Sequence, residues 1–136
     1  VMHQETSSGV RPIDSPVFRD RLLRLHARVL SMKYHSLRML TCNLKGESTG
    51  VAGLVTKLTG CELSHQIAAL AIDALGELGV LYDGSKYLRN GGMWQFQYMF
   101  SLGLIIGGGT AQIQKNIISE RGLGMPREPR LEKGRN

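Results

Sequence analysis

The sequence contains few aromatic residues, cysteines and prolines, and it has no long uninterrupted apolar run. Its 136 residues include four prolines and two cysteines, and aromatic residues make up 6%. A membrane-spanning helix needs about 18 or more consecutive apolar residues, so we expect no membrane span. Cys42 and Cys61 lie inside apolar helical patterns, without any Cys/His metal-ligand spacing around them. The sequence therefore predicts no metal site, two buried free thiols and a reducing compartment, the cytoplasm.

Positive charge is in excess, and this raises the possibility of a nucleic-acid partner. The formal net charge is +6 and the pI is about 9.7. Much of the excess lies in a basic tail, residues 127–136, which we expect to be disordered. Arg19, Arg24 and Arg28 form a short stripe, but no nucleic-acid recognition motif follows it. A basic helical module that binds nucleic acid is therefore the weaker alternative, and we expect no nucleic-acid partner.

Apolar periodicity and glycine or proline punctuation predict an all-α fold. We expect helices at 15–44, 51–76, 93–104 and 110–121, packed as an antiparallel four-helix bundle over residues 15–126, after a linker at 1–14. Ser15-Pro16 is typical of a helix start, and Gly46 of a helix end. The apolar stripe of the first helix consists of Phe18, Leu22, Leu25, Val29 and Met32, continued by Leu37, Leu40 and Leu44.

The few aromatic residues concentrate in the third predicted helix. Trp94, Phe96, Tyr98 and Phe100 occupy alternate positions, so a helix cannot direct all four toward one side. We expect some of them in the core and others at a subunit interface, in preference to an acyl-binding pocket.

The sequence around Gly107-Gly108-Gly109-Thr110 carries the strongest chemical signal. Consecutive glycines before a helix allow positive φ angles and close approach of another group. Thr110 is placed to cap the helix, whose exposed amides suit an anionic or electron-rich ligand. Gln112 can offer such a ligand both a donor and an acceptor. The alternative interpretation is a flexible turn followed by an ordinary capped helix.

A longer string that includes this loop resembles a known family. Gly108-Gly-Thr-Ala-Gln-Ile-Gln-Lys-Asn-Ile-Ile-Ser-Glu-Arg-Gly-Leu-Gly-Met-Pro126 resembles the C-terminal signature of bacterial acyl-CoA dehydrogenases. Lys57-Leu58, Gln66 and the Asp73-Ala-Leu-Gly-x-x-Gly79 turn are similar to the family's second bundle helix and its end. The resemblance spans most of residues 15–126, and it identifies the chain as a C-terminal helical domain.

In that family FAD lies between three domains and a neighbouring subunit. The parent enzyme oxidises an acyl-CoA to the enoyl-CoA: FAD takes the hydride while a base removes the neighbouring proton. The resemblance implies that Thr110 and Gln112 contact FAD, and that Gly108 and Gly109 lie beside the substrate carbonyl. Asp73 stands where many members have a Gln that helps to hold the neighbour's FAD.

The resemblance also implies what the chain does not supply. Many members carry the catalytic base directly before Gly-Thr, and this position is Gly108 here. Because glycine cannot accept a proton, we expect no catalytic residue in this chain and no turnover by the chain alone. The implied partners are acyl-CoA, an electron-transfer partner of the parent enzyme, and other subunits in a homo- or hetero-oligomer, a dimer or tetramer. A non-catalytic subunit of a hetero-oligomeric dehydrogenase is the alternative.

Overall fold

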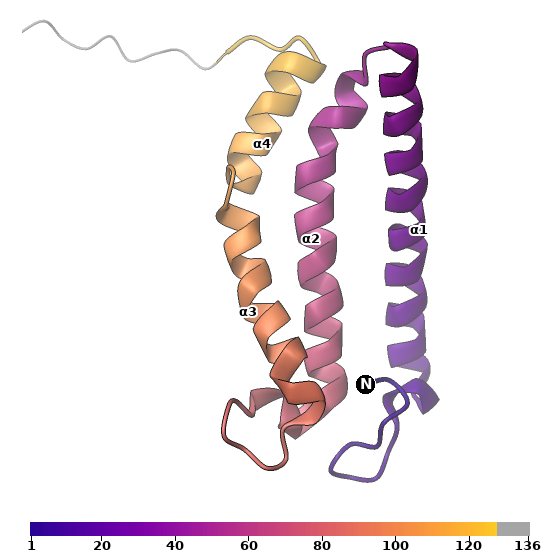
Figure 1. Ribbon diagram of the computed structural model, residues 1–136, viewed down its shortest axis with the longest axis vertical. Coiled ribbons are helices and arrows are strands. Elements are labelled where there is room, and N and C mark those ends of the chain that lie inside the picture. The colour runs from indigo at the N-terminus through magenta and orange to yellow at the C-terminus, as the bar shows by residue number, and fades with distance from the viewer. Residues whose placement is uncertain (128–136) are drawn as a thin grey trace, which may run out of the picture.

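The computed structural model describes residues 1–127, which form an all-helical structure (Figure 1). The α-helices of this part are α1 (Pro16–Lys45), α2 (Gly50–Leu75), α3 (Met93–Ile106) and α4 (Ala111–Ile117), and residues 1–127 contain no β-strand. α2 is the central helix. α1 runs antiparallel along one side of it, and α3 and α4 follow one another along the other side. The predicted all-α fold with four α-helices is confirmed.

Helix boundaries follow the glycine and proline signals. Pro16 is the first residue of α1, as expected, although the Ser15 side chain makes no capping hydrogen bond. Gly46 ends α1 with φ +69°, the left-handed conformation that glycine adopts at low cost. The last predicted helix, 110–121, consists of α4 and a π-helical turn, Ile118–Gly122.

The buried apolar core belongs to α2. Its buried apolar residues are Leu63, Ala68, Leu70, Ala71, Ala74 and Leu75. Small residues on α2 also let α1 approach, because a Cβ atom built at Gly53 would lie 3.4 Å from Met39 Cε, and one at Gly60 3.9 Å from Met32 Cε. At Gly53 the added atom would also lie 2.7 Å from Thr49 Oγ1, so Thr49 would have to move, whereas the contact at Gly60 would be an ordinary van der Waals contact. α1 and α2 therefore lie close together at these two positions.

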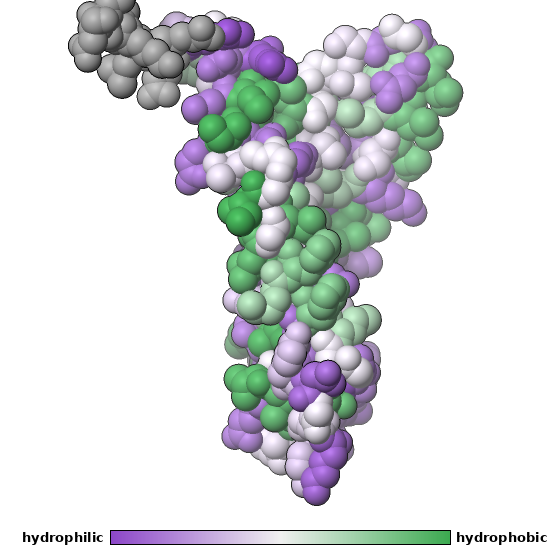
Figure 2. All heavy atoms as spheres, turned by 60° about the vertical axis from the view of Figure 1, so that its left-hand side comes forward, coloured by the Kyte–Doolittle hydropathy of each residue, from purple (hydrophilic) through white to green (hydrophobic). Residues whose placement is uncertain are grey.

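The second half of the predicted α1 stripe is not covered in this structure. Phe18, Leu22 and Leu25 are half-buried, whereas Leu37, Leu40 and Leu44 are exposed. α3 has a similar apolar surface, and Figure 2 shows hydrophobic side chains gathered over the face that α3 and α4 form. Its exposed apolar residues are Met93, Phe96, Met99, Phe100, Leu102, Leu104 and Ile106. As expected from their alternation, Phe96 and Phe100 are exposed while Trp94 and Tyr98 are half-buried.

The first residues fold back onto the helices. The Ile13 amide donates to the Met2 carbonyl at 2.9 Å, and a 3-10 turn, Pro12–Asp14, leads into α1. The Arg11 guanidinium donates to the Asp14 carboxylate at 2.8 Å and lowers the pKa of that carboxyl. At the other end Arg127 pairs with Glu120 at 3.2 Å, while the rest of the predicted basic tail lies outside the described residues. None of the helices in residues 1–127 is both long and apolar enough to cross a bilayer.

Candidate functional site

The junction between α3 and α4 is a loop with a glycine-specific backbone. Gly108 and Gly109 have φ angles of +69° and +106°, in the region that other residues rarely adopt. The Gly107 amide donates to the Gly103 carbonyl at 2.8 Å and ends α3, and the Gly109 amide donates to the Ile106 carbonyl at 3.3 Å. The positive φ angles expected for this loop are thus present at two of its three glycines.

Side chains of α2 and α4 bind the carbonyl groups at this junction. The Lys57 ammonium donates to the Gly109 carbonyl at 2.5 Å and to the Ile105 carbonyl at 3.2 Å. The Gln114 amide nitrogen donates to the Gly108 carbonyl at 3.0 Å. Lys57 is half-buried and Gln114 is buried. The loop backbone is therefore fixed by donors from two elements that lie far apart in the sequence.

Sequence reasoning assigned no function to these two donors. Lys57 entered only through the resemblance of Lys57-Leu58, and Gln114 only as part of the matching string. A usable signal exists for Lys57, which is the one charged residue between Gly50 and Cys61 in a helix that faces two others. A lysine on a packed face needs acceptors for its ammonium group.

Thr110 and Gln112 follow the loop at the start of α4. The Thr110 hydroxyl accepts a hydrogen bond from the Ile113 amide at 3.4 Å, so the predicted cap is confirmed. Gln112 is exposed, which leaves its carboxamide accessible to a ligand. Their part in cofactor binding stays a prediction.

The two substrate-side glycines differ in the space around them. A Cβ atom built at Gly108 would meet only Lys57 Cε, at 4.0 Å, whereas one at Gly109 would lie 2.8 Å from Gln114 Nε2. The loop is thus open at Gly108 and closely packed at Gly109. Another group can approach the backbone at Gly108 without displacing a side chain.

Asp73 lies away from this loop. It follows Lys57 by 16 residues on α2, which corresponds to about 24 Å along the helix axis. Its carboxylate accepts a hydrogen bond from the Arg21 guanidinium of α1 at 2.6 Å. Arg21, Arg24 and Arg28 line a groove of about 340 Å³ on the same seam. Asp73 and Thr110 therefore belong to two separate places on the chain.

A polar pair of a half-buried histidine and a buried serine lies between these places. His65 Nδ1 is 2.9 Å from the Ser101 hydroxyl oxygen, and that hydroxyl donates to the Tyr98 carbonyl at 2.7 Å. Ser101 is 2% exposed. Because the hydroxyl proton is used toward Tyr98, the His65 Nδ1 atom donates, and the ring is the Nδ1–H tautomer when neutral. Sequence reasoning missed this pair.

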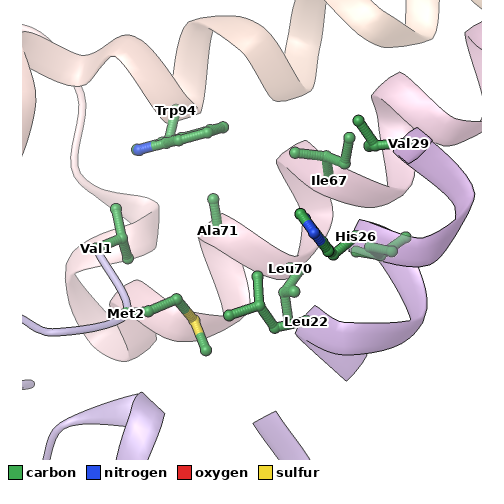
Figure 3. A pocket seen from close by; sticks show the side chains of 10 residues that line it. Val1, Met2, Leu22, His26, Val29, Ile67, Leu70, Ala71 and Trp94 are labelled. Atoms are coloured by element: carbon green, nitrogen blue, oxygen red, sulfur yellow. The ribbon is translucent and has the colours of Figure 1, made fainter. Parts of the chain in front are cut away.

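An apolar hollow lies between α1, α2 and the start of α3 (Figure 3). It has a volume of about 250 Å³, and its lining includes Leu22, Val29, Ile67, Ala71 and Trp94. No group of three His, Cys, Asp or Glu side chains in the described part of the chain could hold a metal ion. The hollow is therefore apolar, in contrast to the glycine loop and the Arg21–Asp73 seam.

Comparison with known proteins shows the family to which the chain belongs. The family described as "Acyl-CoA dehydrogenase, C-terminal domain" matches residues 1–123. The chain belongs to the acyl-CoA dehydrogenase C-terminal domain family. Two relatives are named "Acyl-CoA dehydrogenase IpdE1". The one from Mycolicibacterium smegmatis is 30% identical over 115 residues, and the one from Mycobacterium tuberculosis is 32% identical over 117 residues.

Solved acyl-CoA dehydrogenase structures have the same fold. A chain of the ChsE4-ChsE5 complex from Mycobacterium tuberculosis aligns with a TM-score of 0.76 and 26% identity, covering 93% of this chain and 33% of that chain. The "Tcur3481-Tcur3483 steroid ACAD" aligns with a TM-score of 0.75 and 24% identity, covering 85% and 30% of the two chains. The IpdE1 matches cover 85% of this chain and only 27% and 28% of those proteins. This acyl-CoA dehydrogenase domain therefore spans about a third or less of its relatives.

The residues of the domain can be tested against FAD, the cofactor that the family implies. At the glycine loop, an open backbone at Gly108 and the exposed Gln112 carboxamide fit the polar edge of a flavin ring, which has both donors and acceptors. At the seam, the Asp73 carboxylate would repel an anionic pyrophosphate. The guanidinium groups beside it offset that charge. The polar groups of the glycine loop thus fit the flavin ring of FAD, and the guanidinium groups of the seam fit its pyrophosphate.

Proposed function

We propose that the chain acts as the C-terminal domain of a flavin-dependent acyl-CoA dehydrogenase, which removes the α and β hydrogens of an acyl-CoA thioester. The observation that carries this proposal is the family match over residues 1–123, combined with the positive-φ glycine loop in the string that resembles the family signature. The chain spans only part of its relatives, so the complete activity belongs to a longer protein or a complex.

In this proposal each residue at the glycine loop has a binding task. The open backbone at Gly108 and Gly109 lies beside the thioester carbonyl, and Thr110 and Gln112 contact FAD. FAD, when bound, supplies the acceptor for the hydride that leaves Cβ of the acyl group. The exposed Gln112 carboxamide and the room beside Gly108 support this assignment.

The second contact region in the proposal is the seam that contains Asp73. Arg21 pairs with Asp73 at 2.6 Å, so their charges cancel and the pair attracts an anion only weakly. Arg24 and Arg28 line the same groove and provide positive charge toward a pyrophosphate. We assign this region to a cofactor held by a neighbouring subunit, because about 24 Å of helix separates Asp73 from Lys57 at the glycine loop.

The proton that leaves Cα must be accepted outside this chain. Position 108 is glycine, and a general base has to lie within hydrogen-bond reach of the proton it takes. We therefore place the base on another part of the complete enzyme. Free thiols at Cys42 and Cys61 suit a reducing compartment such as the cytoplasm.

A non-catalytic subunit in a hetero-oligomeric dehydrogenase is the second candidate. The glycine at position 108 favours it, and a 26%-identical structural relative is named as a complex of two proteins, ChsE4 and ChsE5. In that case the partner chain provides the base. Nucleic-acid binding is the weakest candidate, since no nucleic-acid recognition motif follows the stripe of Arg19, Arg24 and Arg28.

The test is a product assay on the longer protein or complex that contains this chain. Mass spectrometry of butyryl-, octanoyl- and palmitoyl-CoA, each incubated with the protein and an artificial electron acceptor, should show the loss of two hydrogen atoms from at least one thioester. The 136-residue chain alone, as the matched control, should leave all three unchanged. Unchanged thioesters with the complete, flavin-loaded protein would contradict the proposed function for these substrates and favour the non-catalytic subunit.

A further inference from the structure

The glycine loop is held by its carbonyl oxygens. Lys57 Nζ binds the carbonyls of Ile105 and Gly109 at 3.2 and 2.5 Å, and Gln114 Nε2 binds that of Gly108 at 3.0 Å. These carbonyls come from the last turn of α3 and from the two glycines with positive φ. The contacts therefore span the break between α3 and α4.

Lys57 makes the long-range part of this attachment. Lys57 lies 48 positions before Ile105 and 52 positions before Gly109, whereas Gln114 lies only six positions after Gly108. A loop of consecutive glycines has more backbone freedom than any other sequence. Without Lys57, the remaining hydrogen bonds to the loop come from α3, α4 or the loop itself, so no hydrogen bond would join the loop directly to α2.

We propose that Lys57 is a positioning residue that sets where the backbone of Gly108 and Gly109 lies for the substrate thioester. This inference rests on the proposed function, which places these glycines beside the thioester carbonyl. A Cβ atom built at Gly108 would lie 4.0 Å from Lys57 Cε, so the lysine stem lies directly beside Gly108, while its ammonium group is bound by the Ile105 and Gly109 carbonyls. Lys57 acts through the loop and does not itself touch the reacting atoms.

The alternative role for Lys57 is that of a C-terminal cap for α3. A lysine that binds the last carbonyls of a helix stabilises that helix. Such a cap would affect the folded fraction and the melting temperature but would leave turnover by the folded enzyme unchanged. Positioning instead affects turnover by the folded enzyme, because a displacement of about 1 Å in a reactive geometry can cost about 100-fold in rate.

The test compares three variants in the complete, flavin-loaded protein. Lys57→Met removes the donors but keeps the length of the side chain, Lys57→Arg keeps a charged donor, and Lys115→Met is the matched control at an exposed lysine of α4. For Lys57→Met we expect kcat to fall by about 100-fold with a change in KM of less than about three-fold. Lys57→Arg should recover part of the loss, and Lys115→Met should retain wild-type kcat.

A second readout follows the loop directly and does not depend on turnover. Hydrogen exchange measured by mass spectrometry should become faster in peptides that cover residues 103–112 of Lys57→Met, and not in those of Lys115→Met. If Lys57→Met fails to fold, Gln114→Leu removes the other side-chain hydrogen bond to the loop, and it should also increase hydrogen exchange and lower kcat.

The outcomes separate this inference from the proposed function. A wild-type protein that dehydrogenates an acyl-CoA, with kcat unchanged in folded Lys57→Met, would overturn the positioning role and leave the proposed function intact. A wild-type protein that oxidises no acyl-CoA would overturn the proposed function and, with it, the role in turnover. Exchange would then decide whether Lys57 holds the loop, and unchanged exchange in Lys57→Met would refute that as well.

Discussion

Gly109→Ala is the substitution for which the structure gives the most definite cost. Gly109 has φ +106°, and a Cβ atom there would lie 2.8 Å from Gln114 Nε2. A non-glycine residue in such a conformation costs about 1–3 kcal/mol. Gln114 is buried, so its displacement breaks the bond to the Gly108 carbonyl and leaves buried polar groups unpaired, at a cost of about 1–3 kcal/mol. We therefore expect the free energy of unfolding to fall by about 2–6 kcal/mol.

Gly46→Ala is the matched control for the backbone contribution. Gly46 has φ +69°, and a Cβ atom there would meet no other atom within 4 Å, so only the conformational cost of about 1–2 kcal/mol applies. Urea unfolding followed by circular dichroism measures both variants. The steric contribution is tested in a Gln114→Ala background, where Gly109→Ala should retain only the conformational cost of about 1–3 kcal/mol. An equal loss in the presence and absence of Gln114 would refute the packing argument.

Three further predictions follow from contacts elsewhere in the chain. Ser101→Ala should lower the free energy of unfolding by about 1–3 kcal/mol, because the His65 Nδ1–H donor loses its buried partner; an unchanged urea midpoint would contradict this. Gly103→Ala should raise the free energy of unfolding by about 0.5–1 kcal/mol, because Gly103 lies inside α3 and an added Cβ would meet no other atom within 4 Å; a loss of stability would show that the helix is strained there. The 136-residue chain should self-associate at micromolar concentration through the apolar surface of α3, which includes Phe96 and Phe100 at 57% and 51% exposure. Sedimentation that detects monomer alone would count against that surface, and Phe96→Ser should shift the equilibrium toward monomer.

Local features of the sequence predicted the helices well. The ends of the first three predicted helices match α1, α2 and α3 to within two residues, because glycine and proline act through their own backbone geometry. The same holds for the Thr110 cap, whose donor is only three residues away. Signals that operate within one or two helical turns can be read from the sequence alone.

Contacts between distant segments could not be predicted in the same way. Lys57 lies 52 positions from Gly109, and Arg21 lies 52 positions from Asp73, so no local pattern connects them. The apolar stripe at Leu37, Leu40 and Leu44 also shows the limit of periodicity, which identifies an apolar face but not what covers it. The resemblance placed Gly108 and Thr110 in the same loop, but the donors that hold that loop became visible only in three dimensions.

In the proposed function, this domain contributes part of a flavin site that other segments of the enzyme complete. The most direct test is the amount of FAD that copurifies with the longer protein or complex, compared with the 136-residue chain, together with the visible spectrum after addition of an acyl-CoA thioester. We expect bound FAD, bleached by the thioester, in the complete protein, and little or no bound FAD in the isolated chain. A stoichiometric flavin on the 136 residues alone, bleached by acyl-CoA, would contradict it, as would a complete protein that binds no flavin.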